Sequence, residues 1–405
     1  MLPFNVMIKP RGAICNLDCD YCYFLKKEHL YPNSDYRMSD AVLEAFICQY
    51  IQAQSSRTPV IFAWQGGEPT LMELEFYRKA VTLQKKYAPT GMLIENAMQT
   101  NGTLLDDEWC TFFKEHDFLI GISIDGPPER HNIYRKNKGG EPSFAQVAAG
   151  LDLLKKHAVR FNILASIHAG NVDHPLEVYR FFRDELGAEF IQFIPIVERD
   201  NKKGEQKGNK VTARSVDARK YGDFLIKIFD EWVHNDVGEV FVQIFDVALG
   251  KWLGKSGGLC VFDEICGQAL AIEHNGDLFS CDHYVEPKHR LGNIMKQDLI
   301  QLVNSHKQRK FGRDKLDTLP KYCMECEVRF VCNGGCPKNR VRHSPDGEFG
   351  LNYLCESYRA FFNHITEPMN MMVGLINARK QPAGIMELLP SVARSEKFGP
   401  LDVIP

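Results

Sequence analysis

The chain has 405 residues, of which 44% are apolar and 25% are charged, and its net charge is −3. This composition predicts one large folded domain plus a smaller one, and the near-neutral charge gives no general attraction for nucleic acid or an anionic membrane. No apolar run reaches the length of a membrane span, and the N-terminus lacks the pattern of a secretion signal. We therefore expect a cytoplasmic protein in which thirteen cysteines serve metal binding rather than disulfides.

The first chemical pattern follows a predicted strand over residues 4–9. Cys15, Cys19 and Cys22 have the spacing C-x3-C-x2-C, and Tyr21 stands just before the last cysteine. Three thiolates can hold three corners of a four-iron cluster and leave the fourth iron open to a small molecule. A zinc site that borrows a fourth ligand is the alternative, although zinc sites usually use C-x2-C pairs.

Strands and helices alternate through the first half of the chain. Predicted strands cover residues 4–9, 59–64, 93–98, 118–122, 160–167 and 190–196, and predicted helices cover 40–53, 75–87, 106–115, 144–157 and 175–186. This alternation predicts a parallel sheet, with too few units for a closed eight-stranded barrel. We expect an α/β fold built as a partial (β/α)6 barrel, with a doubly wound sheet as the alternative, and a site at the carboxyl ends of the strands.

Polar residues and glycines follow several of these strands. The candidates for a binding site are Gln65, Gly66, Gly67, Glu68, Gln99, Ser123, Asp125 and Arg135. Glycine permits close backbone approach to a ligand, and Glu68 can accept hydrogen bonds from an ammonium group. Taken alone, each position is explained equally well by an ordinary turn or a loop-capping residue.

The second half of the chain begins with a polar segment at 200–208, expected to be an exposed loop or a boundary. An amphipathic helix at 217–234 follows, then a β-hairpin at 269–274 and 277–280 with an Asn-Gly turn. Short helices are predicted at 297–305 and from residue 355 to 364. The last forty residues carry no chemical signature.

Eight further cysteines lie in this half, at positions 260, 266, 281, 323, 326, 332, 336 and 355. They suffice for two clusters with four cysteine ligands each, and structural zinc sites are the alternative. The two remaining cysteines, Cys48 and Cys110, fall in predicted helices and are expected to be buried free thiols.

The cysteine triad together with Gly66-Gly67-Glu68-Pro69 resembles the radical S-adenosylmethionine (SAM) superfamily. The resemblance implies that Cys15, Cys19 and Cys22 ligate a [4Fe–4S] cluster and that SAM chelates its open iron. Gly66, Gly67 and Glu68 would meet the SAM amino group. One electron from the cluster would cleave SAM to methionine and a 5′-deoxyadenosyl radical that abstracts hydrogen from an unactivated carbon. Further contacts to SAM or to a peptide are assigned to Tyr21, Gln65, Gln99, Ser123, Asp125 and Arg135.

The order of the later cysteines resembles the SPASM extension of radical SAM enzymes that modify peptides. This resemblance implies one auxiliary cluster on Cys260, Cys266, Cys281 and Cys336, and a second on Cys323, Cys326, Cys332 and Cys355. With the first cluster, the chain would carry three [4Fe–4S] clusters. The expected domains are a radical SAM partial barrel at 1–200, a connecting helical segment at 201–256, a SPASM domain at 257–365 and an extension of unknown role at 366–405.

Cys281-Asp282-His283-Tyr284 narrows the resemblance. Together with Gln-Gly-Gly-Glu-Pro-Thr, Gln-Thr-Asn-Gly-Thr, Asp-Gly-Pro and Leu-Gly-Asn-Ile, it looks like the anaerobic sulfatase-maturating enzymes. These oxidise a cysteine or serine of a sulfatase, in a Cys/Ser-x-Pro/Ala-x-Arg segment, to Cα-formylglycine. The resemblance implies that Asp282 is the base and that a reducing donor such as flavodoxin or ferredoxin is a partner. From the residues alone, Asp282 is equally well a surface aspartate after a hairpin.

Two other functions remain open from the sequence. A different SPASM peptide maturase, forming thioether or carbon–carbon crosslinks, would share every cluster ligand. An electron-transfer protein would use the clusters as a relay, but it has no need for an iron with an open position.

Overall fold

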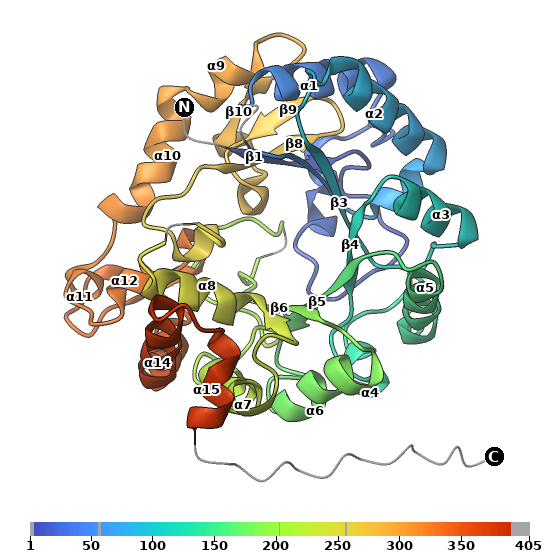
Figure 1. Cartoon of the computed structure of the whole chain (residues 1–405). Coiled ribbons are helices and arrows are strands. Elements are labelled where there is room, and N and C mark those ends of the chain that lie inside the picture. The colour runs from blue at the N-terminus through green and yellow to red at the C-terminus, as the bar shows by residue number, and fades with distance from the viewer. Residues whose placement is uncertain (1–3, 56–57, 202, 256, 390–405) are drawn as a thin grey trace.

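The computed structural model describes residues 4–55, 58–201, 203–255 and 257–389. Its main sheet, within these residues, has ten strands in the order β10-β9-β8-β1-β2-β3-β4-β5-β6-β7 (Figure 1). The strands of this sheet are β1 (Asn5–Lys9), β2 (Val60–Trp64), β3 (Ile94–Thr100), β4 (Leu119–Ser123), β5 (Phe161–Ile167), β6 (Phe190–Pro195), β7 (Phe241–Val242), β8 (Ala269–Glu273), β9 (Asp277–Phe279) and β10 (Arg290–Asn293). A separate pair consists of β11 (Arg340–His343) and β12 (Phe349–Asn352).

Helices connect the strands and form the C-terminal part of the chain. The α-helices are α1 (Asp40–Gln52), α2 (Leu74–Tyr87), α3 (Asp107–Glu115), α4 (Pro128–His131), α5 (Phe144–Lys156), α6 (Pro175–Arg180), α7 (Lys220–Asn235), α8 (Gln243–Trp252), α9 (Leu299–Val303), α10 (His306–Asp317), α11 (Lys321–Met324), α12 (Arg329–Cys332), α13 (Cys355–His364), α14 (Thr366–Asn377) and α15 (Ile385–Leu388). Short 3₁₀ turns are η1 (Leu25–Leu30), η2 (Pro69–Met72), η4 (Cys260–Phe262), η5 (Asp282–Tyr284), η6 (Pro287–His289), η7 (Pro337–Asn339) and η8 (Pro382–Gly384). In the part of the chain that the structure describes, no helix is long and apolar enough to cross a membrane.

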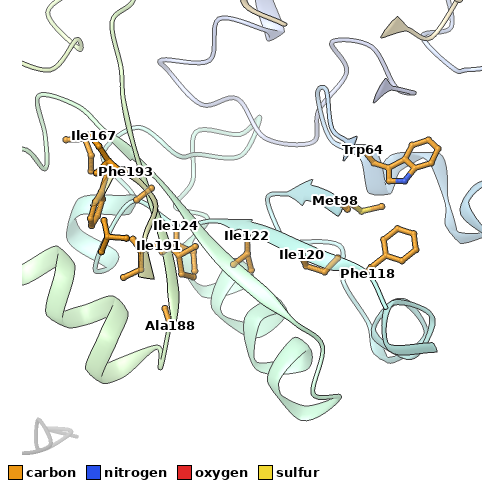
Figure 2. Packing of buried hydrophobic residues seen from close by; sticks show 14 of the residues in the cluster. Trp64, Met98, Phe118, Ile120, Ile122, Ile124, Ile167, Ala188, Ile191 and Phe193 are labelled. Atoms are coloured by element: carbon orange, nitrogen blue, oxygen red, sulfur yellow. The ribbon is translucent and has the colours of Figure 1, made fainter. Parts of the chain in front are cut away.

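The six predicted strands β1 to β6 run parallel and lie in chain order. Because this order does not reverse within the sheet, the fold is the expected partial barrel and not the doubly wound alternative. Side chains on the outer face pack under the helices, and Figure 2 shows part of this core, including Trp64, Met98 and Ile120. The boundaries agree with the sequence within two residues because the apolar alternation that defines each strand is local.

The other face of the sheet carries polar side chains at its carboxyl edge. Successive side chains of a strand point to opposite faces, so Lys9, Gln65, Gln99 and Ser123 share the face turned away from the helices. The register, in which Ile8 pairs with Trp64, brings the ends of β1 and β2 together. This edge is where a parallel sheet is expected to hold its site.

The predicted hairpin of the second half is present but has a further role. β8 and β9 pair antiparallel, and Gly276 of the turn has φ +85°, a left-handed conformation that favours glycine. β8 also pairs parallel with β1, so the hairpin extends the barrel sheet. The sequence predicted the hairpin and not this pairing, because the two strands lie more than 250 residues apart.

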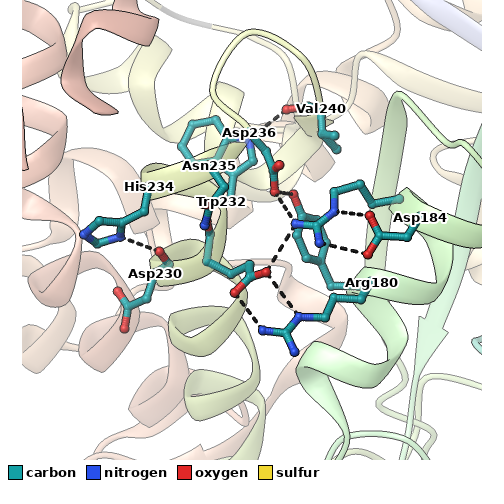
Figure 3. Close-up of polar contacts among 11 residues, drawn as sticks. Arg180, Asp184, Asp230, Trp232, His234, Asn235, Asp236 and Val240 are labelled. Carbon is teal, nitrogen blue, oxygen red and sulfur yellow. Dashed lines mark hydrogen bonds and ion pairs between the residues drawn. The ribbon is translucent and has the colours of Figure 1, made fainter. Parts of the chain in front are cut away.

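The helices near the end of the barrel are joined by ion pairs. α6 continues into a π-helical turn, η3 (Phe181–Glu185), where one longer helix was predicted. Arg180 Nη2 lies 3.0 Å from Glu231 Oε2 of α7, and Arg183 Nη1 lies 2.8 Å from Asp236 Oδ2 just after α7 (Figure 3). These contacts fix the amphipathic helix that the sequence predicts at 217–234.

The last residues of the described chain pack against this same end of the barrel. α14 lies against α8, and α15 lies against α7. Met369 and Met372 of α14 are fully buried. The extension from residue 366 thus covers α7 and α8 as far as residue 389, and residues 390–405 lie outside the described part.

Candidate active site

The loop that carries the first three cysteines is held by the loop that follows β2. The Gly67 amide donates to Gly12 O at 2.8 Å, and the Glu68 amide donates to Ile14 O at 2.8 Å. A Cβ on Gly67 would lie 1.9 Å from Ile14 O, which real atoms do not tolerate. Close approach to another part of the backbone is therefore sufficient reason for glycine at position 67.

Gly67→Ala is expected to lower the stability of the protein by roughly 2 kcal/mol or more, because the cysteine loop must move to admit the methyl group. The measurement is the midpoint of thermal unfolding. Gly250→Ala in α8 is the matched control, because a Cβ there meets nothing within 4 Å. An unchanged midpoint for Gly67→Ala would contradict the predicted clash.

The three thiols of this loop affect one another's pKa through their charges. All thirteen cysteines of the chain are free thiols. Burial is the main cause that raises the pKa of Cys15 to about 12, and the charges of Glu68, Cys22 and Cys19 raise it further. Burial likewise raises the pKa of Cys19 to about 11, with a further contribution from Cys22. Coordination of iron would have to displace protons from these thiols.

Glu68 is buried and its carboxylate is held by donors of the protein. It accepts hydrogen bonds from the Thr70 amide at 3.0 Å and hydroxyl at 2.7 Å, the Thr100 hydroxyl at 2.7 Å and the Asn101 amide at 2.8 Å. Three of these donors contact Oε1 and one contacts Oε2, so Oε2 keeps one acceptor site. The side chain ties the loop after β2 to the end of β3, and its contact with SAM stays a prediction.

Three more of the predicted residues form one buried network. The Tyr21 hydroxyl donates to Asp125 Oδ2 at 2.6 Å, and Arg135 Nη1 donates to the Tyr21 oxygen at 2.8 Å. His168 Nε2 lies 3.6 Å from Asp125 Oδ2. Burial opposes ionisation of Asp125, but Arg135 and His168 outweigh it and hold its pKa at about 2. This network ties the cysteine loop to the ends of β4 and β5.

Arg135 keeps one donor free within this network. Its side chain is buried, and among the described residues its Nε has no hydrogen-bond partner. The charge of Arg135 lowers the pKa of Cys19, against the larger effect of burial, so the guanidinium faces the cysteine loop. A buried, unpaired guanidinium N–H beside the cluster loop suits an anionic group of a ligand.

Four of the later cysteines form a first group beside the barrel. Burial raises the pKa of the Cys260, Cys266 and Cys281 thiols, and the charge of Cys336 adds to the increase at all three. Lys315 of α10 donates to Cys260 O at 2.6 Å and Val261 O at 2.8 Å, which fixes their loop. These are the four cysteines that the resemblance assigns to one auxiliary cluster.

The other four later cysteines form a second group. Cys323, Cys326, Cys332 and Cys355 line one small pocket. Burial raises the pKa of Cys355 to about 12, and the charges of Cys323 and Cys326 raise it further. The charge effects between these thiols run within the same two groups of four, and their role as cluster ligands stays a prediction.

Arg340 interacts with thiols of both cysteine groups, and no role was predicted for it from the sequence. Its guanidinium donates to Lys315 O at 2.6 Å and Gly334 O at 3.4 Å. Burial lowers its pKa, while the charges of Cys323, Cys336 and Cys266 raise it. No local signal distinguishes this arginine from others in the chain.

Asp282, the predicted base, is held by two residues of the N-terminal segment. Lys9 Nζ lies 2.5 Å from Oδ1, and the Tyr23 hydroxyl donates to Oδ2 at 2.5 Å. Burial opposes ionisation of Asp282, but the Lys9 ammonium outweighs it and holds the pKa at about 2. Asp282 is therefore not a surface residue after a hairpin, because its charge faces the loop of the first cluster.

The chemistry of the donors at the expected sites is that of iron–sulfur clusters, although no group of three or more ligands among the described residues is arranged to hold a metal ion. Each expected site offers only thiols, three in the first loop and four in each later group, and none is tied up in a disulfide. Thiolate is the usual ligand of iron–sulfur clusters. Outside these groups, Cys110 is buried and Cys48 half-buried, both in helices as predicted.

Comparison with protein families identifies two matching regions. Residues 10–182 match the radical SAM superfamily. Residues 260–327 match SPASM, an iron–sulfur cluster-binding domain, which favours iron over the zinc alternative.

Curated relatives match nearly the whole chain. A serine-type anaerobic sulfatase-maturating enzyme of Bacteroides thetaiotaomicron is 48% identical over 397 residues, which cover 96% of this chain and 95% of the relative. A cysteine-type anaerobic sulfatase-maturating enzyme of Clostridium perfringens is 35% identical over 376 residues, which cover 90% of this chain and 96% of the relative.

Solved structures agree with these relatives. The structure of anSMEcpe with bound AdoMet and a Cp18Cys peptide has a TM-score of 0.82 at 33% identity, and the match covers 93% of this chain and 100% of that one. Streptococcus suis SuiB bound to precursor peptide SuiA shares the fold, with a TM-score of 0.62 at 14% identity, covering 87% of this chain and 76% of SuiB.

Proposed function

Because this chain belongs to the anaerobic sulfatase-maturating enzymes of the radical SAM superfamily, we propose that it oxidises a serine or cysteine of a sulfatase to Cα-formylglycine. The observation that carries the proposal is the contact between Tyr23 and Asp282, which are 259 residues apart. Tyr23 follows the loop of the first three cysteines, so this contact supports a role for Asp282 in a reaction at that loop.

The cofactors of this reaction would be held by the three thiol groups. We assign one cluster to Cys15, Cys19 and Cys22, and the auxiliary clusters to the groups of Cys260, Cys266, Cys281 and Cys336 and of Cys323, Cys326, Cys332 and Cys355. When bound, SAM and these clusters would supply the acceptors for a hydrogen atom and an electron.

The remaining predicted residues would orient SAM or the peptide. Gly66, Gly67 and Glu68 would contact the SAM amino group, the glycines through their backbone and Glu68 through the remaining acceptor site of Oε2. The free Nε of Arg135 suits the SAM carboxylate. Gln65, Gln99 and Ser123 stand at the ends of β2, β3 and β4 on the face turned away from the helices, where they would contact SAM or the peptide.

Asp282 is the proposed acceptor of the substrate proton. Oxidation to an aldehyde removes a hydrogen atom from Cβ, a proton from the side-chain hydroxyl or thiol, and one further electron, which makes two electrons in all. Serine gives the aldehyde directly, and cysteine gives a thioaldehyde that exchanges sulfur for oxygen with water. The Asp282 carboxylate is in its charged form and is therefore able to accept the proton.

The partners follow from this reaction. The peptide would enter from the open side of the partial barrel, and a reducing protein such as flavodoxin or ferredoxin would supply electrons. A cytoplasmic location would provide that reducing environment.

Reconstituted protein, incubated with SAM and a reductant, is expected to convert a sulfatase peptide into an aldehyde that a hydrazide reagent captures. Mass spectrometry of the captured peptide is the measurement. We expect turnover of the serine peptide, because the serine-type relative is 48% identical and the cysteine-type relative 35%. A peptide with alanine at the target position is the control.

Two outcomes would contradict this function. A peptide that loses hydrogens without reacting with the hydrazide would indicate a crosslinking maturase. Absence of 5′-deoxyadenosine would favour an electron-transfer protein.

A further inference from the structure

Two buried lysines of the N-terminal segment pair with two acidic residues that follow Cys281. Lys9 Nζ lies 2.5 Å from Asp282 Oδ1, and Lys27 Nζ lies 3.5 Å from Glu286 Oε1. The side chains of these lysines are only 1% and 2% exposed. Burying an ammonium group is costly unless it is paired, so each lysine needs its carboxylate.

The carboxylate that pairs with the Lys9 ammonium group is that of Asp282. Lys9 ends β1, and its Nζ lies 3.8 Å from the centre of the Phe24 ring. Phe24 follows Tyr23, whose hydroxyl donates to the other oxygen of Asp282 at 2.5 Å. Both oxygens of the carboxylate are thus held by residues that flank the first cysteine loop.

Within its own turn, Asp282 has only a distant partner, because His283 Nδ1 lies 3.8 Å from Oδ2. It begins η5, a turn of three residues that starts directly after Cys281. Its side chain is 12% exposed. A carboxylate has about four acceptor sites, and Lys9 and Tyr23 each occupy one, which leaves acceptor sites for a substrate proton.

We propose that Lys9, together with Tyr23, is a positioning residue that aims the Asp282 carboxylate at the substrate. The inference rests on the proposed role of Asp282 as the base. Lys9 does not touch the substrate in this proposal. It fixes the direction and the distance of the group that does, which matters because small misplacements of a catalytic group cost large factors in rate.

The competing explanation is that Lys9 only fastens the loop after Cys281 to the barrel. Lys27 makes the equivalent contact four residues further on, where Glu286 also accepts a hydrogen bond from the Gln206 amide at 2.7 Å. Lys27→Met and Lys9→Met each delete a buried ammonium and leave one carboxylate of the same loop unpaired. The pair is a matched test, because only Lys9 contacts Asp282.

The experiment compares formylglycine and 5′-deoxyadenosine formed by the cluster-loaded enzyme with a serine sulfatase peptide. Lys9→Met is expected to lower formylglycine about tenfold or more while 5′-deoxyadenosine changes less than about threefold, so the ratio of the two products falls. Lys9→Arg is expected to restore most of the ratio because it keeps the charge. Lys27→Met is expected to leave the ratio unchanged.

A second set of variants separates this inference from the proposed base. In an Asp282→Asn background, Lys9→Met is expected to cause no further fall in formylglycine. Tyr23→Phe removes the hydroxyl that donates to Asp282 Oδ2. In the otherwise unchanged enzyme it is expected to lower the ratio of formylglycine to 5′-deoxyadenosine. This variant tests the positioning role even if Lys9→Met does not fold. Equal loss of both products in Lys9→Met, with an unchanged ratio in Tyr23→Phe, would overturn the positioning role. Full formylglycine formation by Asp282→Asn alone would instead remove the base, whatever Lys9 does.

Discussion

Replacing Asp282 by asparagine is expected to lower formylglycine formation about 100-fold or more, the usual contribution of a general base. Asparagine keeps the shape of the side chain and can still accept from the Tyr23 hydroxyl that now contacts Oδ2, but its amide is not a base. SAM cleavage depends on the first cysteine loop and is expected to continue. Initial rates of aldehyde and 5′-deoxyadenosine, measured in the same reaction, test both statements.

The matched control for this variant is Glu286→Gln. It neutralises a carboxylate of the same loop that pairs with a buried lysine, and it has no proposed contact with the substrate. We expect aldehyde formation close to that of the unchanged enzyme. If Asp282→Asn and Glu286→Gln behaved alike, the effect would come from the loop and not from a base.

Replacing any one of Cys15, Cys19 and Cys22 by alanine is expected to abolish SAM cleavage and, with it, aldehyde formation. Each cluster holds four irons, so the iron content is expected to fall from about twelve to about eight per chain. A loop with two thiols offers too few ligands to retain a cluster that already leaves one iron open. Iron analysis and 5′-deoxyadenosine formation are the measurements.

Cys48→Ala is the control for the triad, because Cys48 is a free thiol in α1, outside every cysteine group. It should keep the full iron content and full activity. A triad variant that retained about twelve irons and still cleaved SAM would refute the assignment of the first cluster.

Most of the barrel was predictable because its signals are local. Apolar alternation placed β1 to β6 within two residues. The helix predicted at 40–53 begins at Asp40 as expected, and the Ser39 side chain caps it by accepting from the Val42 amide at 3.3 Å. The π-helical turn after α6 was missed, since it depends on packing against α7 and has no separate sequence pattern. The pairing of β8 with β1 was missed because strand partners distant in sequence leave no local trace.

In the site, too, contacts between residues far apart in sequence could not be predicted. Cysteine spacing and the resemblance predicted the two groups within which the later thiols interact through their charges, since spacing is visible in the chain. The contacts of Asp282 with Lys9 and Tyr23 were not foreseen, because they join residues far apart in sequence. One signal was available: a lysine that closes the apolar strand Asn5–Lys9, where a charge needs a buried partner.

Glu68 illustrates how a motif can be correct while the reason given for it is incomplete. Its carboxylate was expected to receive an ammonium group, and it also accepts from four protein donors. Gly67 likewise needs to be glycine because Ile14 O lies where its side chain would be. Both residues shape the loop from within, which spacing alone cannot distinguish from ligand contact.

The pairing of β8 with β1 has a consequence for biosynthesis. During translation, β1 leaves the ribosome early, but its neighbour on one side is made only after residue 269. Until then the nascent chain presents an open strand edge, and Lys9 lacks its carboxylate. Such an edge invites aggregation and engages chaperones. The barrel half can therefore complete its sheet only after β8 (Ala269–Glu273) has been made, and a fragment that stops before β8 would lack both the strand that closes this edge and Asp282.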